Sequence, residues 1–365
     1  MRIVLIISSL SRGGAERVMS IMANYWARRG KDVTIVTIDS KESDSYFLHP
    51  RVKRIALALM KPSLRPWEPF QNNFYRVKCL RREIKALDAD VVISFVDKTN
   101  VLVLLATFGL GPRVVVSERI DPLRHRIGWT WQGLRRLLYI RASAVVVQSH
   151  RVVGWAQTFL PRGLVYSIPN PVEVAPPGKK KDHYALPAGR SIVAMGRLTR
   201  QKGYDLLLRA FAVCAPKHPE WCLVIFGEGE ERHQLGTLAK QLGIANRVIL
   251  PGLAENPTVV LRKADLFVLS SRFEGFPNAL LEAMACGLPV VSFDCPCGPR
   301  EIIRNGEDGV LVPSGNLASL AAAMDSLMAN ENERKRLSIR AKDVTKRFGL
   351  EKVMGMWEDL LSGIL

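Results

Sequence analysis

The chain has 365 residues, 48% of them hydrophobic and 24% charged, which is the composition of a folded globular protein and excludes a disordered one. This length is too great for one ordinary hydrophobic core and fits two domains of roughly 150 to 200 residues. No apolar run reaches the ~18 residues of a membrane span, so we expect no transmembrane helix.

The positive charge is concentrated in the first half of the chain. The formal net charge is +18, and residues 1–170 hold 27 Lys and Arg against 12 Asp and Glu, whereas residues 171–365 hold 25 against 22. Such an excess favours an anionic partner, either nucleic acid or the surface of an anionic membrane.

Cysteine usage and the N-terminus indicate a chain that stays in a reducing cytoplasm. The six cysteines show no disulfide framework, and the close pair Cys295 and Cys297 lacks the spaced Cys or His partners of a zinc site. Residues 1–10 mimic a signal sequence, but no small-residue cleavage site follows them. We therefore expect residues 2–8 to form the first parallel strand, and we expect no cofactor.

A glycine pair follows this first strand. Gly13 and Gly14 precede apolar residues that recur at helical spacing from Val18 to Tyr25, which predicts a strand, a glycine turn and a helix. Adjacent glycines let the backbone approach a ligand, although an ordinary tight turn has the same pattern. The dinucleotide fingerprint Gly-x-Gly-x-x-Gly is not found here and no P-loop occurs in the chain, which argues against a dehydrogenase and a P-loop kinase.

Four more strands are predicted in the first half, at residues 31–38, 88–95, 114–119 and 144–149. Asp88 and Asp90 resemble an Asp-x-Asp metal pair, but they stand where a strand begins, whereas ligands of open parallel sheets gather at the carboxyl ends. We therefore predict no metal site. The strand at 114–119 delivers Ser117, Glu118 and Arg119 at its carboxyl end.

Two segments of the first half, residues 65–82 and 123–141, are both basic and aromatic. In the second segment, spacings of three and four define one apolar stripe, which consists of Leu123, Ile127, Trp131, Leu134 and Leu138. Arg124, Arg135 and Arg136 lie off this stripe, so the helix could lie in a membrane interface with its arginines on lipid phosphates. The alternative is that the stripe packs on the core and the arginines are solvated. The charge of the first half favours the membrane surface.

A domain boundary is expected at Pro169–Pro171, where two prolines flank one asparagine. The second half then opens with a strand at 191–195 that presents Arg197 at its carboxyl end, and Lys202 follows just ahead of a helix. Two cations at one strand end suit a diphosphate, because Arg offers a planar fork and Lys a point charge. A solvated loop would leave both cations unexplained.

Further strands of the second half are predicted at 221–229, 247–252, 264–270, 290–293 and 309–312, with helices at 317–329 and 331–347. The strand at 264–270 leads through a turn with Glu274 into a helix that Asn278 is expected to cap. Free N–H groups at a helix start bind anions, phosphate above all. Glu282, about one turn into the helix, could accept hydrogen bonds from a ribose diol. The alternative is a surface loop and a solvated Glu282.

Three motifs of the chain resemble the signature of the retaining nucleotide-sugar glycosyltransferases of family 4, also called group 1: Glu274-Gly-Phe-Pro-Asn-Ala-Leu-Leu-Glu282, Gly196-Arg-Leu-Thr-Arg-Gln-Lys-Gly203 and Pro169-Asn-Pro171. The resemblance implies the GT-B fold, in which two α/β domains with Rossmann-like parallel sheets face each other across a cleft and a C-terminal helix crosses back. The domains implied are an acceptor-binding, membrane-facing domain at 1–169, a donor-binding domain at 170–350 and a crossover helix at 351–365.

The resemblance also implies the site residues. It assigns donor binding to Gly13, Gly14, Arg197, Lys202, Leu253, Glu274, Gly275, Phe276, Pro277, Asn278, Ala279, Leu280 and Glu282. Arg197 and Lys202 would hold the leaving diphosphate without a metal, Glu274 would orient the sugar, and Glu282 would anchor the ribose. Arg119 stands nearest the place where many relatives carry a histidine, and it completes the implied catalytic set.

The function implied is transfer of a sugar from a nucleotide diphosphate sugar, with UDP favoured, to an acceptor hydroxyl with retention at the anomeric carbon. We expect a lipid-linked saccharide of bacterial polysaccharide, lipopolysaccharide or protein-glycan assembly as acceptor, at the inner face of the cytoplasmic membrane. Two other classes stay open. A nucleotide-sugar epimerase would need no acceptor, and a nucleic-acid-binding protein would explain the charge, although no nucleic-acid module is recognisable in the sequence.

Overall fold

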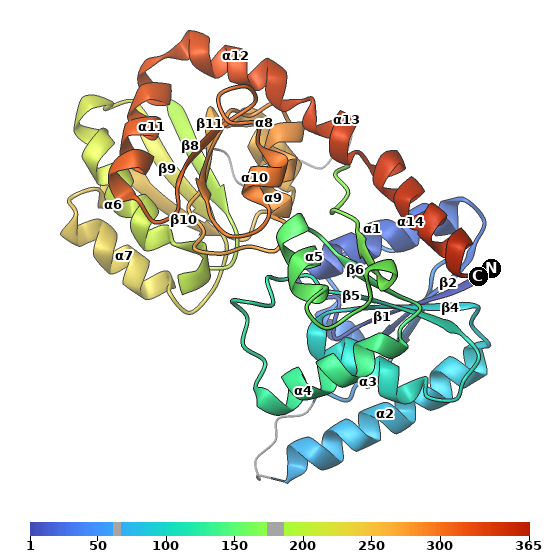
Figure 1. Cartoon of the computed structure of the whole chain (residues 1–365). Helices are drawn as coiled ribbons and strands as arrows, with labels where there is room; N and C mark the ends of the chain where they lie inside the picture. The colour runs from blue at the N-terminus through green and yellow to red at the C-terminus, as the bar shows by residue number, and fades with distance from the viewer. Residues whose placement is uncertain (61–66, 174–185) are drawn as a thin grey trace. The chain divides into compact units, whose positions relative to one another are not determined.

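The computed structural model describes residues 1–60, 67–173 and 186–365. Contacts divide the chain into two units (Figure 1). Unit 1 comprises Met1–Asn170 and Val353–Leu365, and unit 2 comprises Pro171–Lys352. Arg65 and Pro66, the first positions of the basic segment predicted at 65–82, lie outside the described residues.

Unit 1 contains a seven-stranded parallel sheet with the strand order β3-β2-β1-β4-β5-β6-β7. Its strands are β1 (Arg2–Ile7), β2 (Asp32–Thr37), β3 (Lys53–Ala56), β4 (Val91–Phe95), β5 (Arg113–Ser117), β6 (Ala144–Val147) and β7 (Val165–Ser167). The strand order reverses between β1 and β4. Loops from the carboxyl ends of such strands diverge, and open α/β sheets bind ligands at that point.

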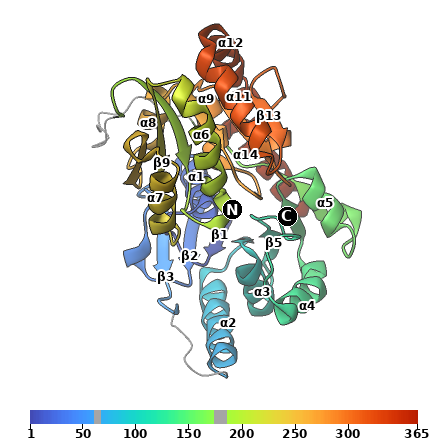
Figure 2. The ribbon, with the colours of Figure 1, turned by 90° about the vertical axis from the view of Figure 1, so that its left-hand side faces the viewer.

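The helices of unit 1 are α1 (Gly14–Arg28), α2 (Glu68–Leu87), α3 (Asp97–Ala106), α4 (Trp129–Leu138) and α5 (His150–Ala156), together with most of α14 (Leu350–Ile364). Both α2 and α4 contact α3, and two views place them at the same end of the unit (Figures 1 and 2). In α14, the fully buried Trp357 lies 6.4 Å from the ring of Phe95. The predicted return of the C-terminal helix to the first domain is therefore confirmed.

Unit 2 contains a six-stranded parallel sheet with the order β10-β9-β8-β11-β12-β13. Its strands are β8 (Arg190–Met195), β9 (Trp221–Phe226), β10 (Val248–Gly252), β11 (Leu266–Leu269), β12 (Val290–Asp294) and β13 (Val310–Pro313). Its helices are α6 (Tyr204–Cys214), α7 (Arg232–Gln241), α8 (Pro257–Lys263), α9 (Asn278–Ala285), α10 (Pro299–Ile302), α11 (Leu317–Ala329), α12 (Glu331–Ala341) and α13 (Val344–Phe348).

Alternation along β8 divides the interior of unit 2 into two cores. Ile192 and Ala194 pack with residues of α6 and α11, whereas Val193 and Met195 pack with residues of α8 and α9. Successive side chains of a strand point to opposite faces, so helices cover both faces of the sheet. This is the α/β architecture that the alternation of strands and helices predicted for each half.

The predicted strands are all present, and the patterns missed β3 and β7. Both are short edge strands whose residues are only partly buried, so they lack the apolar run that marked the central strands. The single helix predicted at 331–347 is instead two helices, α12 and α13. Leu337 packs in one core of unit 2 and Val344 in the other, so the chain must turn between them.

The helix predicted over residues 123–141 is shorter than expected, because α4 begins at Trp129 after Gly128, whose φ is 86°. The prediction that Arg135 is available to lipid phosphates is wrong. Arg135 is fully buried, and its Nη1 donates to Glu118 Oε1 at 3.3 Å. Its guanidinium also lies 4.6 Å from the ring centre of Trp155. The arginine therefore supports the interior of unit 1.

The apolar stripe predicted for this helix lies mainly against the protein. Ile127 and Leu138 are buried, whereas Trp129, Leu137 and Ile140 on the other side are exposed. None of the helices in the described part of the chain is long and apolar enough to span a membrane.

Candidate active site

Two predicted catalytic residues of unit 2 meet where β8 and β11 end. These strands are neighbours in the sheet, so the loops that follow them leave from adjacent points on one edge. Nζ of Lys202 donates to Oε1 of Glu274 at 2.7 Å. The hydroxyl of Ser271 lies 2.5 Å from the same carboxylate oxygen and donates to it. The structure thus joins Lys202 and Glu274, which lie 72 positions apart in sequence.

Side-chain and backbone contacts hold these two loops together. The hydroxyl of Ser270 donates to the carbonyl of Lys202 at 2.9 Å, and the Gln201 amide donates to the carbonyl of Phe273 at 2.9 Å. Gly203 has a left-handed backbone with φ 63°, and a Cβ there would lie 2.1 Å from the Ser270 carbonyl oxygen. Only glycine permits this approach, so Gly203 sets the spacing of the two loops.

The Lys202–Glu274 pair is largely shielded from water, with side-chain exposures of 18% and 7%. A buried charge without a partner is costly, so each residue supplies the counter-charge that the other requires. Burial raises the pKa of Tyr204, and the charge of Glu274 raises it further. The same two causes, burial first, raise the pKa of the Cys295 thiol. Both groups are therefore neutral at physiological pH.

The helix after this loop, α9, begins at Asn278. The prediction that Asn278 caps this helix is wrong by one position, because Pro277 occupies the N-cap and no side chain caps the helix there. N–H groups in the first turn of a helix have no acceptor within it, so those of Ala279 and Leu280 can face an anion. Glu282 lies one turn further on and is buried. A carboxylate therefore stands close to the electropositive end of this helix.

Arg197 differs from Lys202 in being exposed. Within the described ranges, no side chain forms an ion pair or hydrogen bond with its guanidinium. Gly196, immediately before it, has φ 155°, and a Cβ there would lie 3.0 Å from Cε of Lys202. The loop after β8 therefore presents Lys202, which is paired, close to Arg197, which has no such partner among the described residues.

The remaining donor residues predicted in unit 2 fall into two groups. Phe276 and Leu280 are buried, and the ring of Phe276 packs edge-on against Phe348 at 5.5 Å. Their side chains belong to the core, so only their backbone groups are available to a ligand. Leu253, which follows β10, is exposed.

In unit 1, the predicted glycine pair lies between β1 and α1. Gly13 has an extended backbone with φ −149°, so its conformation does not require glycine. A Cβ on Gly13 would instead lie 2.1 Å from Oε2 of Glu16. The Glu16 carboxylate therefore covers the backbone of Gly13, and contact of Gly13 and Gly14 with a donor stays a prediction.

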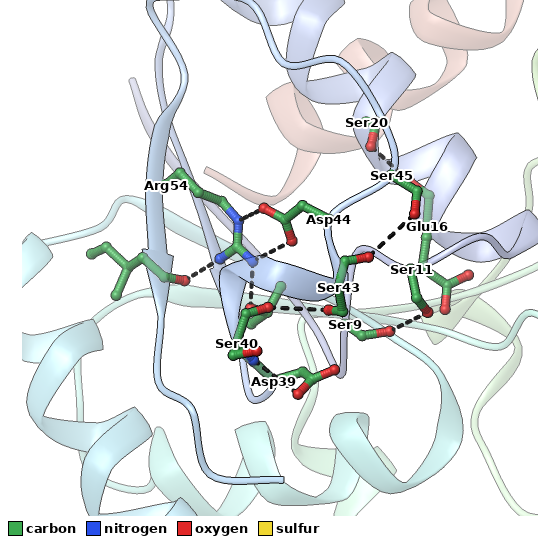
Figure 3. Close-up of polar contacts among 12 residues, drawn as sticks. Ser9, Ser11, Glu16, Ser20, Asp39, Ser40, Ser43, Asp44, Ser45 and Arg54 are labelled. Carbon is green, nitrogen blue, oxygen red and sulfur yellow. Dashed lines mark hydrogen bonds and ion pairs between the residues drawn. The ribbon is translucent and has the colours of Figure 1, made fainter.

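An arginine that the sequence patterns did not indicate supports this glycine loop (Figure 3). Arg54 of β3 forms two hydrogen bonds of 2.8 Å with the carboxylate of Asp44, and its Nη2 donates to Thr37 Oγ1 at 2.7 Å. Arg54 and Asp44 retain only 11% and 22% of their side-chain exposure. A fork of this kind fixes the orientation of both groups, so it pins the loop after β2 to β3.

The pinned loop in turn contacts the loop that carries the glycine pair. Asp44 is followed by Ser45, whose N–H donates to the carbonyl of Leu10 at 2.9 Å. The hydroxyl of Tyr46 donates to the carbonyl of Gly13 at 2.8 Å. The position of the glycine loop therefore depends on the loop that Arg54 holds. No sequence signal pointed to Arg54, because β3 itself was missed.

Arg119 follows β5, and its guanidinium lies over the ring of Phe95, 3.5 Å from the ring centre. Its Nη1 donates to Oδ1 of Asn170 at 2.8 Å. Asn170 is the asparagine between the two prolines at the predicted boundary. Arg119 therefore links the end of β5 to the last residue of the first segment of unit 1. Its catalytic role stays a prediction.

The sequence analysis placed Glu118, the residue before Arg119, at the carboxyl end of a strand, but no pattern indicated that it is a site residue. It is buried, and its Oε1 accepts from the hydroxyl of Tyr139 at 2.6 Å and from Arg135 at 3.3 Å. Burial raises the pKa of Glu118 to about 7, Arg135 opposes the rise, and Asp97 adds to it. Asp97 also lies 3.5 Å from Nε2 of His125. The sequence could not reveal this cluster, since burial is a tertiary property.

The Asp-x-Asp pair has an explanation in the structure. Nη1 of Arg2 lies 2.6 Å from Asp88, and the backbone N–H of Arg2 donates to Asp90 at 2.7 Å. Both aspartates thus bind the amino end of β1. Over residues 1–60, 67–173 and 186–365, no three His, Cys, Asp or Glu side chains are grouped as a metal site requires.

Two family models match the chain. The model for glycosyl transferases group 1 matches residues 179–344, and the model for glycosyltransferase family 4 matches residues 12–175. An N-acetylgalactosaminyltransferase of Campylobacter jejuni, named for acting on an undecaprenol-linked saccharide, is 28% identical over 367 residues, with 100% of this chain and 99% of that protein covered.

An exopolysaccharide phosphotransferase of Streptomyces coelicolor is 33% identical over 292 residues, which cover 78% of this chain. The chain spans only 30% of that relative's length. The solved structure of HepE from Anabaena with UDP and glucose is similar, with a TM-score of 0.79, 20% identity and 99% of each chain covered. The predicted fold of two Rossmann-like domains of the GT-B type is confirmed by this likeness and by the two sheets.

Proposed function

We propose that this chain, whose family matches support a group 1 glycosyltransferase, transfers a sugar from a UDP-sugar to a hydroxyl of a lipid-linked saccharide, with retention and without a metal ion. The observation that carries the proposal is the Lys202–Glu274 pair, which joins the loop that carries Arg197 to the loop that leads into α9. Positive charge for a diphosphate and a carboxylate for a sugar thus occupy one edge of a sheet. The UDP and glucose bound to HepE support the choice of donor.

The cations would act on the leaving group. Negative charge on the departing diphosphate grows in the transition state, so donors that are already oriented stabilise it without reorganisation. Arg197 is exposed and has no side-chain partner among the described residues, and the N–H groups of Ala279 and Leu280 lie in the first turn of α9, where helices bind anions. Lys202 has three ammonium hydrogens, so its bond to Glu274 leaves two for phosphate oxygens.

The two carboxylates would have different roles because their surroundings differ. Glu274 is held by Lys202 and Ser271, so it can orient a sugar hydroxyl and stabilise positive charge that develops on the sugar. Glu282 lies inside α9, where it would accept hydrogen bonds from the ribose diol of the nucleotide. The backbone after β10, at Leu253, would contact the base.

The acceptor is assigned to unit 1. The name of the Campylobacter relative describes an undecaprenol-linked substrate, and this relative aligns over the whole chain, which supports a lipid-linked saccharide and a place in the assembly of a bacterial glycan. Gly13 and Gly14 lie at the end of β1 and Arg119 at the end of β5, on the edge where parallel sheets bind ligands. We assign Arg119 to the catalytic set, and Gly13 and Gly14 to a loop that contacts the donor phosphates and faces the acceptor.

Calorimetric titration with UDP, GDP and ADP tests the donor site. We expect UDP to bind most tightly and Glu282→Ala to weaken it by about 10- to 150-fold, because a hydrogen bond to a charged group contributes roughly 1.5–3 kcal/mol. Glu230→Ala is the matched control, since Glu230 is an exposed carboxylate of the same unit. If the two variants bind UDP with equal affinity, Glu282 does not bind the ribose.

The reaction itself is tested with a radiolabelled UDP-sugar and a lipid-linked acceptor. We expect transfer that depends on the acceptor, persists in EDTA and gives a product with the anomeric configuration of the donor by NMR. Conversion of the nucleotide sugar to an isomer in the absence of acceptor would indicate an epimerase instead. Inversion at the anomeric carbon would contradict the retaining mechanism.

A further inference from the structure

Among the described residues of unit 1, several of the exposed large apolar side chains gather on the helices α2 and α4, whereas Phe47, which is 72% exposed, lies apart from them in sequence. On α2, Phe70 and Phe74 are exposed by 79% and 68%, and Tyr75 beside them is also exposed. This helix is 20 residues long but buries only Cys79, Leu80 and Ile84, all in its second half. Its first half therefore extends beyond the packed part of the unit.

The exposed side of α4 is similar. Trp129 is exposed by 96% and Leu137 by 69%, and Ile140 follows three residues later. Trp129 and Leu137 are eight positions apart, which is about two helical turns, and Ile140 lies in the 3-10 turn that continues α4, so these side chains lie on one side. Both helices pack on α3 and lie at the same end of unit 1 (Figures 1 and 2). Exposed apolar surface of this extent in a folded domain marks an interaction site.

The exposed charges around these apolar side chains are positive, and the two acidic residues of α2, Glu68 and Glu83, are partly buried. Between Arg119 and Arg141 the single acidic residue is Asp121, which is fully buried. The charged groups exposed in that segment are arginines, at positions Arg124, Arg126, Arg136 and Arg141. On α2, the exposed charged groups are Lys78, Arg81, Arg82 and Lys85. The surface thus combines aromatic rings with positive charge.

We propose that α2 and α4 form a docking surface for a bilayer with anionic phospholipid headgroups. Phe70, Phe74 and Trp129 enter the interface, and the lysines and arginines lie on lipid phosphates. Aromatic rings and aliphatic side chains partition into the headgroup region, and each cation close to an anionic surface adds to binding. The aliphatic Leu137 and Ile140 favour lipid over nucleic acid, because single strands are bound by stacking on aromatic rings in polar, basic grooves.

The proposal goes beyond the donor chemistry, because docking requires no nucleotide and no acceptor. Sedimentation with vesicles therefore tests it in isolation. The full-length protein is mixed with vesicles of phosphatidylcholine containing 30% phosphatidylglycerol, or with phosphatidylcholine alone, at low and at physiological salt. We expect sedimentation with the anionic vesicles that weakens with salt, and much weaker sedimentation with the neutral ones.

Two variants separate the apolar and the electrostatic contributions. Phe70→Ser with Phe74→Ser should lower partitioning at least tenfold, and Arg124→Gln with Arg126→Gln and Arg136→Gln should lower it about a hundredfold at low salt. All five side chains are exposed, so circular dichroism and thermal unfolding should be unchanged. The matched control is a unit 2 variant with the same kinds of change, which are Val213→Ser, Ile339→Ser, Lys240→Gln and Lys263→Gln, all at exposed positions.

The control should sediment like the wild type. Failure of the wild type to sediment with anionic vesicles at low salt would overturn the proposal. Equal partitioning of the wild type and both unit 1 variants would also overturn it, as would tight binding to an RNA or DNA oligonucleotide without vesicle binding. If the protein binds UDP but not vesicles, the docking surface is overturned and the proposed function stands. If it binds vesicles but not UDP, the docking surface stands and the proposed donor site is overturned.

Discussion

Unit 1 and unit 2 share one architecture but use charge and apolar surface differently. Unit 1 contains 27 Lys and Arg against 14 Asp and Glu, whereas unit 2 contains 25 against 20. Among the described residues, the large apolar side chains that unit 2 exposes are Val213, Leu253 and Ile339, and none is aromatic. Unit 1 exposes aromatic rings on both α2 and α4.

The ion pairs of the two units also differ in where they lie. In unit 2, Lys202 and Glu274 pair at the edge of the sheet beside the unpaired Arg197. In unit 1, the Arg135–Glu118 pair is buried and the Arg54–Asp44 pair is partly buried, and both pairs connect elements of the unit. Both units use buried charges for support, since the fully buried Asp308 of unit 2 binds Arg304 and Arg347. We infer that the charges at the edge of the unit 2 sheet serve a small anionic ligand, whereas the exposed charges of unit 1 serve a broad surface.

The largest effect is expected at the pair in unit 2. Lys202→Ala removes a cation from the diphosphate and leaves the carboxylate of Glu274 without its partner. We expect kcat to fall by 10²- to 10³-fold, or about 3–4 kcal/mol, with a smaller rise in KM for the donor. Lys217→Ala is the control, because Lys217 pairs with Asp325 at an exposed site of the same unit. A change confined to KM would show that Lys202 only binds the donor.

The next largest effect is the pH dependence of the unfolding free energy that Glu118 of unit 1 causes. Because burial raises the pKa of Glu118 to about 7, the folded protein holds a proton that the unfolded chain releases near pH 4.3. The stabilisation from this proton is complete below about pH 4.3 and is lost as the pH rises through 7. Relative to Glu118→Gln, which does not titrate, the wild type should lose about 2–3 kcal/mol of unfolding free energy between pH 5 and 8.

Urea unfolding at pH 5, 6, 7 and 8 measures this difference. The comparison must be between the two proteins at each pH, since other groups titrate in both. A difference that stays constant with pH, or that grows in favour of the wild type at pH 8, would contradict a raised pKa for Glu118. UDP affinity should be equal in the two proteins if unit 1 uses this buried pair only for support.

The smallest effect is expected at Arg54. Arg54→Met removes the fork to Asp44 and leaves a partly buried carboxylate unpaired, so we expect a loss of about 1–3 kcal/mol in unfolding free energy. KM for the acceptor should rise more than UDP affinity falls, because the glycine loop that loses its support faces the acceptor and makes only part of the donor contacts. Lys53→Met is the control, because its exposed pair with Asp32 is worth less than about 1 kcal/mol. A loss of UDP affinity larger than the rise in KM for the acceptor would contradict this division between the two units.

Sequence patterns predicted the strands of both sheets where burial on two faces produces an apolar run. Residues 91–95 and 223–226 are wholly buried, and both were predicted as strands. The patterns failed for β3, which reads Lys-Arg-Ile-Ala, and for β7, which reads Val-Tyr-Ser, because neither has the run of three aliphatic residues that marked even the edge strands β10 and β13. They also failed for the helix at 123–141, where the stripe was identified correctly but its orientation and length were not.

The sequence by itself determined the loops that carry the candidate donor site. Gly203 and Gly196 mark backbone that other residues cannot adopt, and the spacing from Glu274 to Glu282 marks a turn and a helix start, because these are local requirements. Only the tertiary structure decided which charges meet. Lys202 reaches Glu274 because β8 and β11 are neighbours, and Arg135 is buried because Glu118 lies beneath α4. Pairing of charges that are distant in sequence depends on strand order and on burial, and the local spacing of residues predicts neither.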